Sequence, residues 1–178
     1  VLYTIALDDP AAVIRPVTAS LRTPSYVKEA SSLLLAVSNF EPDIVARKLL
    51  TCLSDPRRSL VASGLLKNMS GFSPYHRMVI GSKMTDFIVE DDLFPHIISI
   101  LVDIWTSAPD HDLHARSIGE YMFPMMEPFG KALCSERKRA AAVRMLSELG
   151  KYFPQPIRRF AAHLEKINSG DAAVYRAV

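Results

Sequence analysis

Prolines that separate runs of apolar residues constrain the fold of this chain more than any other feature. Pro24 and Pro56 lie 32 residues apart in equivalent turns, each between two runs in which apolar side chains recur at helical spacing. A proline is favoured at the start of a helix because its fixed φ suits the first turn and its missing N–H needs no partner there. The pattern predicts repeating helix pairs, and a period of about 30–45 residues with two helices is typical of an α-solenoid.

Four apolar runs predict four helices in the first half of the chain. In the first run, Val13, Val17 and Leu21 share one helical face. Asp8 or Asp9 is expected to cap this helix, because a short carboxylate accepts a hydrogen bond from an unpartnered backbone N–H. We expect helices over residues 10–22, 26–39, 42–53 and 60–69.

The second half of the chain is less regular. Pro124 and Pro128 are expected to kink the chain or restart a helix, since each removes a backbone donor and clashes with the preceding turn. We expect helices over residues 74–89, 93–106, 111–123, 137–151 and 154–168. With 7 glycines and no sustained alternation of apolar and polar residues, the chain is predicted to be all-α.

A single helical-repeat domain is expected over residues 1–178, because domains run to roughly 100–200 residues. Its regular repeats are predicted over residues 10–72. The predicted remainder consists of a less regular part at 73–123, a repeat-like part at 124–168 and a tail at 169–178.

Three stretches carry a resemblance to a known family. They read IRPVTASLRTPSYVKEASSLLLAVSN, DIVARKLLTCLSDPRRSLVASGLL and MMEPFGKALCSERKRAAAVRMLSELG. Pro16, Asp55-Pro56 and Pro128 stand where HEAT repeats carry proline and aspartate, so the chain resembles HEAT repeats, with armadillo repeats as near relatives. The resemblance implies a right-handed α-solenoid of about four to five antiparallel helix pairs. It also implies a curved scaffold for protein or RNA binding, with no shared catalytic residue.

Motifs of enzymes are missing from the sequence. Phosphate-binding loops and nucleophile elbows need glycines at set offsets, and here the glycines are isolated from one another. We therefore expect no enzymatic activity, no cofactor and no small-molecule substrate.

The stretch Asp110-His111-Asp112-Leu113-His114 is the densest cluster of metal-ligating residue types. His111 and His114 could share a helix face and bind Zn²⁺ with a carboxylate as third ligand. The favoured interpretation is a polar turn whose aspartate caps the next helix, so a metal site is not predicted.

Cysteines and acidic residues receive structural interpretations. Cys52 and Cys134 stand beside Leu53 and Leu133, and both thiols are expected to be buried and unreactive. Two cysteines are too few for a four-thiolate metal site, and unpaired thiols suit a reducing compartment. The run Glu90-Asp91-Asp92 lacks the ligand number and the turn glycine of a Ca²⁺ loop, so helix capping and a solvated loop are expected.

Charge is distributed unevenly along the chain. The net charge of +2 hides a segment at 131–166 with a net +6 and a segment at 86–127 with a net −8. The basic segment binds RNA phosphates or an acidic protein in one interpretation, and in the other it pairs partly with the acidic segment of the same chain. The candidate basic surface consists of Lys131, Arg137, Lys138, Arg139, Arg144, Arg158 and Arg159.

Five of these basic residues stand at the starts of two successive predicted helices, so we expect them to gather on one edge. They are Arg137, Lys138, Arg139, Arg158 and Arg159. Positive charge at a helix N-terminus opposes the helix dipole, which favours a functional reason for it. Tyr152, Phe153 and Phe160 are the only nearby candidates for base stacking, and packing in the core is the favoured interpretation for all three.

The expected function is a non-enzymatic scaffold or protein-interaction subunit of a larger assembly, with other protein subunits as partners. The alternative is an RNA-binding helical-repeat protein of an organellar or ribonucleoprotein complex that uses segment 131–166. An all-α enzyme or metal protein built on His111 and His114 ranks behind both.

The expected location is intracellular and soluble. The longest apolar stretch, residues 93–105, is shorter than the ~20 residues that span a bilayer. No signal peptide opens the chain, and its start at Val1 suggests a processed product or a piece of a longer protein.

Overall fold

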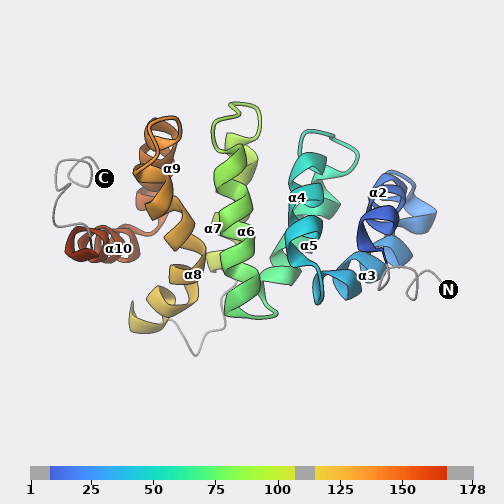
Figure 1. The fold of residues 1–178 in the computed structure, drawn as a ribbon, viewed down its shortest axis with the longest axis horizontal. Helices are drawn as coiled ribbons and strands as arrows, with labels where there is room; N and C mark the ends of the chain where they lie inside the picture. The colour runs from blue at the N-terminus through green and yellow to red at the C-terminus, as the bar shows by residue number, and fades with distance from the viewer. Residues whose placement is uncertain (1–8, 107–114, 168–178) are drawn as a thin grey trace. The chain divides into compact units, whose positions relative to one another are not determined.

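The computed structural model describes residues 9–106 and 115–167, without the side chains of 115–121 and 165–167 (Figure 1). Within these ranges the chain forms nine α-helices and no strand, so the all-α prediction is confirmed. The helices are α2 (Pro10–Ser20), α3 (Val27–Ser38), α4 (Pro42–Cys52), α5 (Ser59–Ser70), α6 (Pro74–Phe87), α7 (Phe94–Thr106), α8 (Ala115–Leu133), α9 (Arg139–Tyr152) and α10 (Pro154–Ile167).

Proline marks the helix starts as predicted. Pro10, Pro42, Pro74 and Pro154 are the first residues of α2, α4, α6 and α10, and Pro24 opens a short 3₁₀ turn before α3. At the start of α2, the backbone N–H of Ala12 donates to Asp9 Oδ1 at 3.1 Å, which confirms the predicted cap.

Proline also lies inside two helices. Pro16 is within α2, and α8 continues through both Pro124 and Pro128. Neither proline restarts the chain, so the helix expected to stop at residue 123 runs on to Leu133. Each of these prolines lacks the N–H that would donate to the carbonyl four residues earlier.

The chain forms two compact units, residues 1–83 and 84–178, and the boundary between them falls within α6. In unit 1, α2 packs against α3 and α4, and α3 packs against α4 and α5. In unit 2, α7 packs against α8 and α9, and α8 packs against α9 and α10. Each unit therefore pairs a helix with the next helix and with the next but one.

Apolar stripes on the helices build the two cores. Burying one such side chain stabilises the fold by about 1.5–3 kcal/mol. Leu60, the second residue of α5, lies outside these stripes and is 84% exposed. Fully buried residues include Ile14, Leu34, Leu49, Leu66 and Met69 in unit 1, and Ile97, Leu101, Phe129, Met145 and Leu149 in unit 2.

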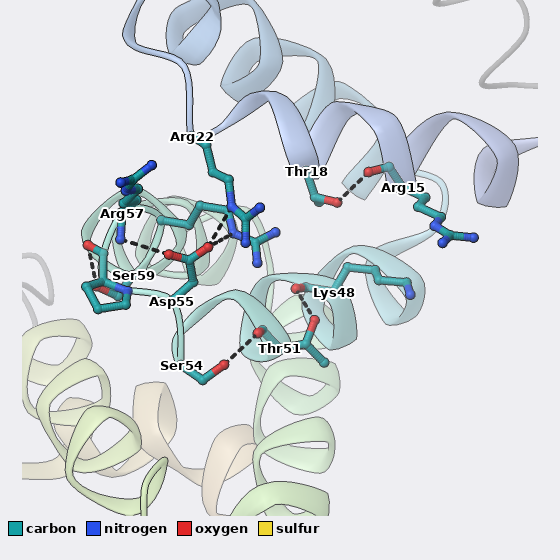
Figure 2. A network of polar contacts seen from close by, with 11 residues as sticks. Arg15, Thr18, Arg22, Lys48, Thr51, Ser54, Asp55, Arg57 and Ser59 are labelled. Atoms are coloured by element: carbon teal, nitrogen blue, oxygen red, sulfur yellow. Dashed lines mark hydrogen bonds and ion pairs between the residues drawn. The ribbon is translucent and has the colours of Figure 1, made fainter.

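A carboxylate clamp holds the turn between α4 and α5 (Figure 2). Asp55 Oδ2 accepts hydrogen bonds from Arg22 Nε at 2.7 Å and Arg58 Nε at 2.8 Å. Its other oxygen, Oδ1, accepts from the backbone N–H of Arg57 at 3.0 Å. The hydrogen bond from Arg22, followed by that from Arg57, lowers the pKa of Asp55 below its ordinary value. The clamp ties the turn after α2 to the start of α5.

The backbone of this turn recurs before α7 and before α9. In all three turns, one carbonyl accepts hydrogen bonds from the N–H groups three and four residues later. The accepting carbonyls are those of Asp55 (2.9 and 2.9 Å), Glu90 (3.0 and 3.0 Å) and Ser135 (3.1 and 2.8 Å).

Candidate functional site

A groove lies between α7 and α9 in unit 2. One side follows α7, where Ile98 and Val102 are half-buried and stand one helical turn apart. The other side follows α9, where Arg144, Glu148 and Tyr152 recur every four residues and therefore share one face. The groove has a volume of about 520 Å³, and its lining is completed by Phe94, Pro95, Ser99 and Asp103.

Two aromatic contacts show how α7 and α9 lie side by side. Near the start of α7, the Arg144 guanidinium lies over the Phe94 ring, 4.0 Å from its centroid. At the far end, the rings of Trp105 and Phe153 meet edge to face with centroids 5.2 Å apart. The contact nearer the start of α7 involves the earlier residue of α9, and the contact at the end of α7 involves the residue that follows α9. The two helices therefore run in the same direction.

Arg144 closes one end of the groove. Its NH1 donates to Asp91 Oδ1 at 3.1 Å. Both side chains are largely exposed, so this ion pair contributes only about 0–1 kcal/mol. The stacking on Phe94 adds about 0.5–1 kcal/mol. The charge of Arg144 is therefore already engaged within the protein.

The opposite end of the groove is aromatic and acidic. Tyr152 is 58% exposed there. Glu148 lies one turn earlier on α9 and accepts from Lys151 Nζ at 2.7 and 2.8 Å through its two oxygens. Asp103 lines the groove from α7. Among the residues that the structure describes, the lining therefore carries two carboxylates and one cation.

The structure divides the candidate basic surface predicted from the sequence. Three of its seven side chains form ion pairs, and all three acidic partners belong to the acidic segment 86–127. Pairing within the chain, one of the two interpretations of the charge pattern, thus accounts for part of the basic segment. The pairs are Lys131 with Glu127 at 2.8 Å, Lys138 with Asp86 at 2.7 Å and Arg144 with Asp91 at 3.1 Å.

The other four basic residues stand in two places. Arg137 and Arg139 lie at the start of α9, whereas Arg158 and Arg159 lie in α10, which begins after α9 ends. Most of α9, a helix of 14 residues, lies between the two places in the sequence. Arg139 Nε donates to the carbonyl of Leu133 at 3.0 Å. Among the side chains that the structure describes, Arg137 and Arg158 have no ion-pair partner.

The predicted burial of the two thiols is confirmed for Cys52 and wrong for Cys134. Cys52 is 2% exposed, and burial raises the pKa of its thiol. Cys134 is exposed. It follows the last residue of α8, and neighbouring residues point about 100° apart around a helix, so a buried Leu133 directs Cys134 outward.

The aromatic residues of the basic segment also differ from one another. Phe160 is buried and Phe153 is half-buried, but Tyr152 is exposed, so the prediction of core packing is wrong for Tyr152. The run 90–92 forms an exposed turn, as expected.

The weak metal candidate, His111 with His114, lies outside the described residues. Within residues 9–106 and 122–164, no three His, Cys, Asp or Glu side chains gather in a way that could hold a metal ion. Among the helices placed by the structure, none is both long and apolar enough to cross a membrane.

Sequence reasoning missed the groove itself. Of its lining residues, Tyr152 was expected in the core. The available signal was the spacing of Arg144, Glu148 and Tyr152, which places a charged and aromatic stripe beside the buried stripe of α9.

Comparisons of the chain with protein-family models, with curated proteins and with solved structures found no match.

Proposed function

We propose that this chain is a non-enzymatic interaction module, a right-handed α-solenoid of the HEAT or armadillo kind, that serves as a subunit of a larger assembly. Two features support the proposal. In each unit a helix packs against the next and the next but one, which is the contact pattern of stacked helix pairs. The turn that precedes α5, α7 and α9 has the same backbone hydrogen bonds each time.

The groove between α7 and α9 is the proposed binding surface, and one observation carries this choice. An exposed tyrosine stands beside two half-buried aliphatic side chains, Ile98 and Val102, along an open channel. Protein interfaces are enriched in aromatic residues that anchor in such apolar surroundings, and charged residues are depleted at their centres. A segment of a partner protein is therefore the proposed occupant.

RNA binding through segment 131–166 is the weaker alternative. Phosphate recognition needs cations that gather and are free to release their counterions. Lys131, Lys138 and Arg144 are ion-paired within the chain, whereas Arg137 and Arg139 stand at the start of α9 and Arg158 and Arg159 stand in α10.

A site-specific photo-crosslinker tests the proposal. A benzoylphenylalanine at Ser99, which is exposed and lines the groove, is expected to crosslink to one defined segment of a protein partner. The same residue at Ser147, exposed on α9 and outside the groove, is the matched control and should not give this product.

The identified segment is then made synthetically, and its affinity for the purified chain is measured. The proposal predicts that Ser99→Tyr abolishes binding and that Ser147→Tyr leaves it unchanged. Equal loss or equal retention by both variants would reject the groove as the site. A crosslink to RNA, with an affinity that falls steeply with salt and on Arg137→Ala/Arg158→Ala, would favour the alternative.

A further inference from the structure

The charges of the groove point to the chemistry of its occupant. We propose that the groove between α7 and α9 binds a short amphipathic helix of a partner protein whose apolar stripe ends in a Lys or Arg, with that cation at the Tyr152 end. This inference rests on the proposed function and adds to it the class of segment that is bound.

The shape of the groove favours a helix as occupant. Phe94, Ile98 and Val102 are spaced four residues apart along α7, as are Arg144, Glu148 and Tyr152 along α9. Such rows form ridges with a step of about 6 Å, and the ridges of a third helix fit into the groove between them. Apolar side chains at positions i, i+4 and i+7 of a partner helix present a stripe of matching period.

The position of the charges determines which end of the occupant is cationic. At the start of the groove, Arg144, the one cation among the described lining residues, is already bound by Asp91 and stacked on Phe94. At the other end, the described lining residues Glu148 and Asp103 are both carboxylates.

A partner cation can compete for Glu148 at this end. The bond between Glu148 and Lys151 joins residues three apart on an exposed helix face, and such pairs contribute little, so exchange is easy. Tyr152 supplies an exposed ring over which a guanidinium or ammonium group can stack. An acidic segment would meet like charge at the same place, so charge complementarity favours a basic segment over an acidic one.

A peptide selection on the full chain tests the inference. The probe is a displayed library of random peptides of about 16 residues with a helix-forming background, long enough to cover the groove. Selected peptides should carry an apolar stripe at helical spacing with Lys or Arg at one end. Selection of acidic peptides, or of peptides without any charge preference, would overturn the inference.

Charge exchange between the chain and a selected peptide gives the decisive measurement. Glu148→Lys should weaken binding by roughly tenfold or more, and replacing the cation of the peptide by Glu should restore affinity to this variant and not to the parent chain. The control Glu136→Lys makes the same change in net charge at an exposed position outside the groove, and it should bind like the parent.

The outcomes separate the inference from the proposed function. Loss of binding on Ser99→Tyr without any response to the Glu148→Lys exchange would keep the groove and reject the cationic occupant. Binding that survives Ser99→Tyr would reject both. Self-association of the chain that depends on the groove, in place of peptide binding, would also overturn the inference.

Discussion

The turn before α5 in unit 1 and the turn before α9 in unit 2 share their backbone hydrogen bonds and differ in side-chain chemistry. In unit 1 the accepting residue is Asp55, whose carboxylate binds two arginines and a backbone N–H. In unit 2 the same place is taken by Ser135, and the nearby Lys138 instead binds Asp86 at the end of α6. One backbone shape is thus supported by a clamp within the turn in unit 1 and by a distant acid in unit 2.

The strongest test of the comparison uses two leucines in equivalent positions after these turns. Leu66 and Leu146 are both fully buried, and truncation to Ala removes packing and leaves a cavity, which costs about 2–5 kcal/mol. Trp105 is the single tryptophan of the chain and belongs to unit 2, so its fluorescence follows the unfolding of that unit.

Leu146→Ala should therefore shift the denaturation midpoint seen by Trp105 fluorescence. Leu66→Ala should shift a far-ultraviolet circular dichroism transition and move the fluorescence midpoint less. If the two variants move both signals equally, the units unfold as one, and the distinction between them loses its energetic meaning.

Removal of the clamp is the next largest effect. Asp55→Asn takes the charge from a group bound by Arg22 and Arg58, so the melting temperature at pH 7 should fall, and more than it does for Ser135→Ala. The pKa of Asp55 is lower in the folded chain than its ordinary value of 3.8, so its stabilising effect is complete above that value. This contribution is lost as the pH falls through the folded pKa.

Melting temperatures of the parent chain and of Asp55→Asn, measured over a range of acidic pH, test the direction of this pH dependence. The difference in melting temperature between the parent and Asp55→Asn should shrink as the pH falls below about 4. A difference that stays constant across this range would show that the ionised carboxylate is not the source of the stabilisation.

An acidic residue placed in the turn before α9 should have a smaller effect on stability, in the opposite direction to the loss of Asp55. Ser135→Asp puts a negative charge beside Arg137 and Lys138 and before the N-terminus of α9, which should raise stability by about 0.3–1 kcal/mol. Urea unfolding measures the change, and Ser147→Asp within α9 is the control that should not stabilise. A loss of stability on Ser135→Asp would mean that the two turns are not equivalent in their electrostatics.

The smallest expected change in stability comes from replacing the exposed thiol of Cys134. The two thiols should nevertheless differ clearly in their reactivity. Cys134→Ser should change stability by less than about 0.5 kcal/mol, because the side chain is exposed. In a native thiol titration one equivalent should react at once, and the second, from Cys52, should react only on unfolding. Rapid reaction of both thiols in the native protein would contradict the burial of Cys52.

The helices could be predicted from the sequence because their signals are local. Prolines such as Pro42 and Pro154 mark helix starts whatever the rest of the chain does, and apolar spacing reports the buried face. The burial of a side chain was wrongly predicted where it was inferred only from the residue next to it in the sequence. Tyr152 and Cys134 adjoin buried stripes, but the rotation of the helix turns both outward.

The groove and the charge pairing could not be predicted, because they depend on contacts between distant segments. Arg144 meets Asp91 and Phe94 from about 50 residues away in the sequence, and Lys138 meets Asp86 across a similar separation. No local sequence pattern predicts which acidic side chain forms an ion pair with a given Lys or Arg.

The sharing of α6 between the two units has a practical consequence for cutting the chain into fragments. Lys83 binds Asp43 at 2.6 Å within unit 1, whereas Asp86, less than one turn later, binds Lys138 within unit 2. A fragment of unit 2 that begins in the turn after α6 lacks Asp86 and the buried Met84, and a fragment of unit 1 that ends before α6 lacks Lys83. We therefore expect soluble halves only from fragments that both retain α6, so that its sequence is present twice.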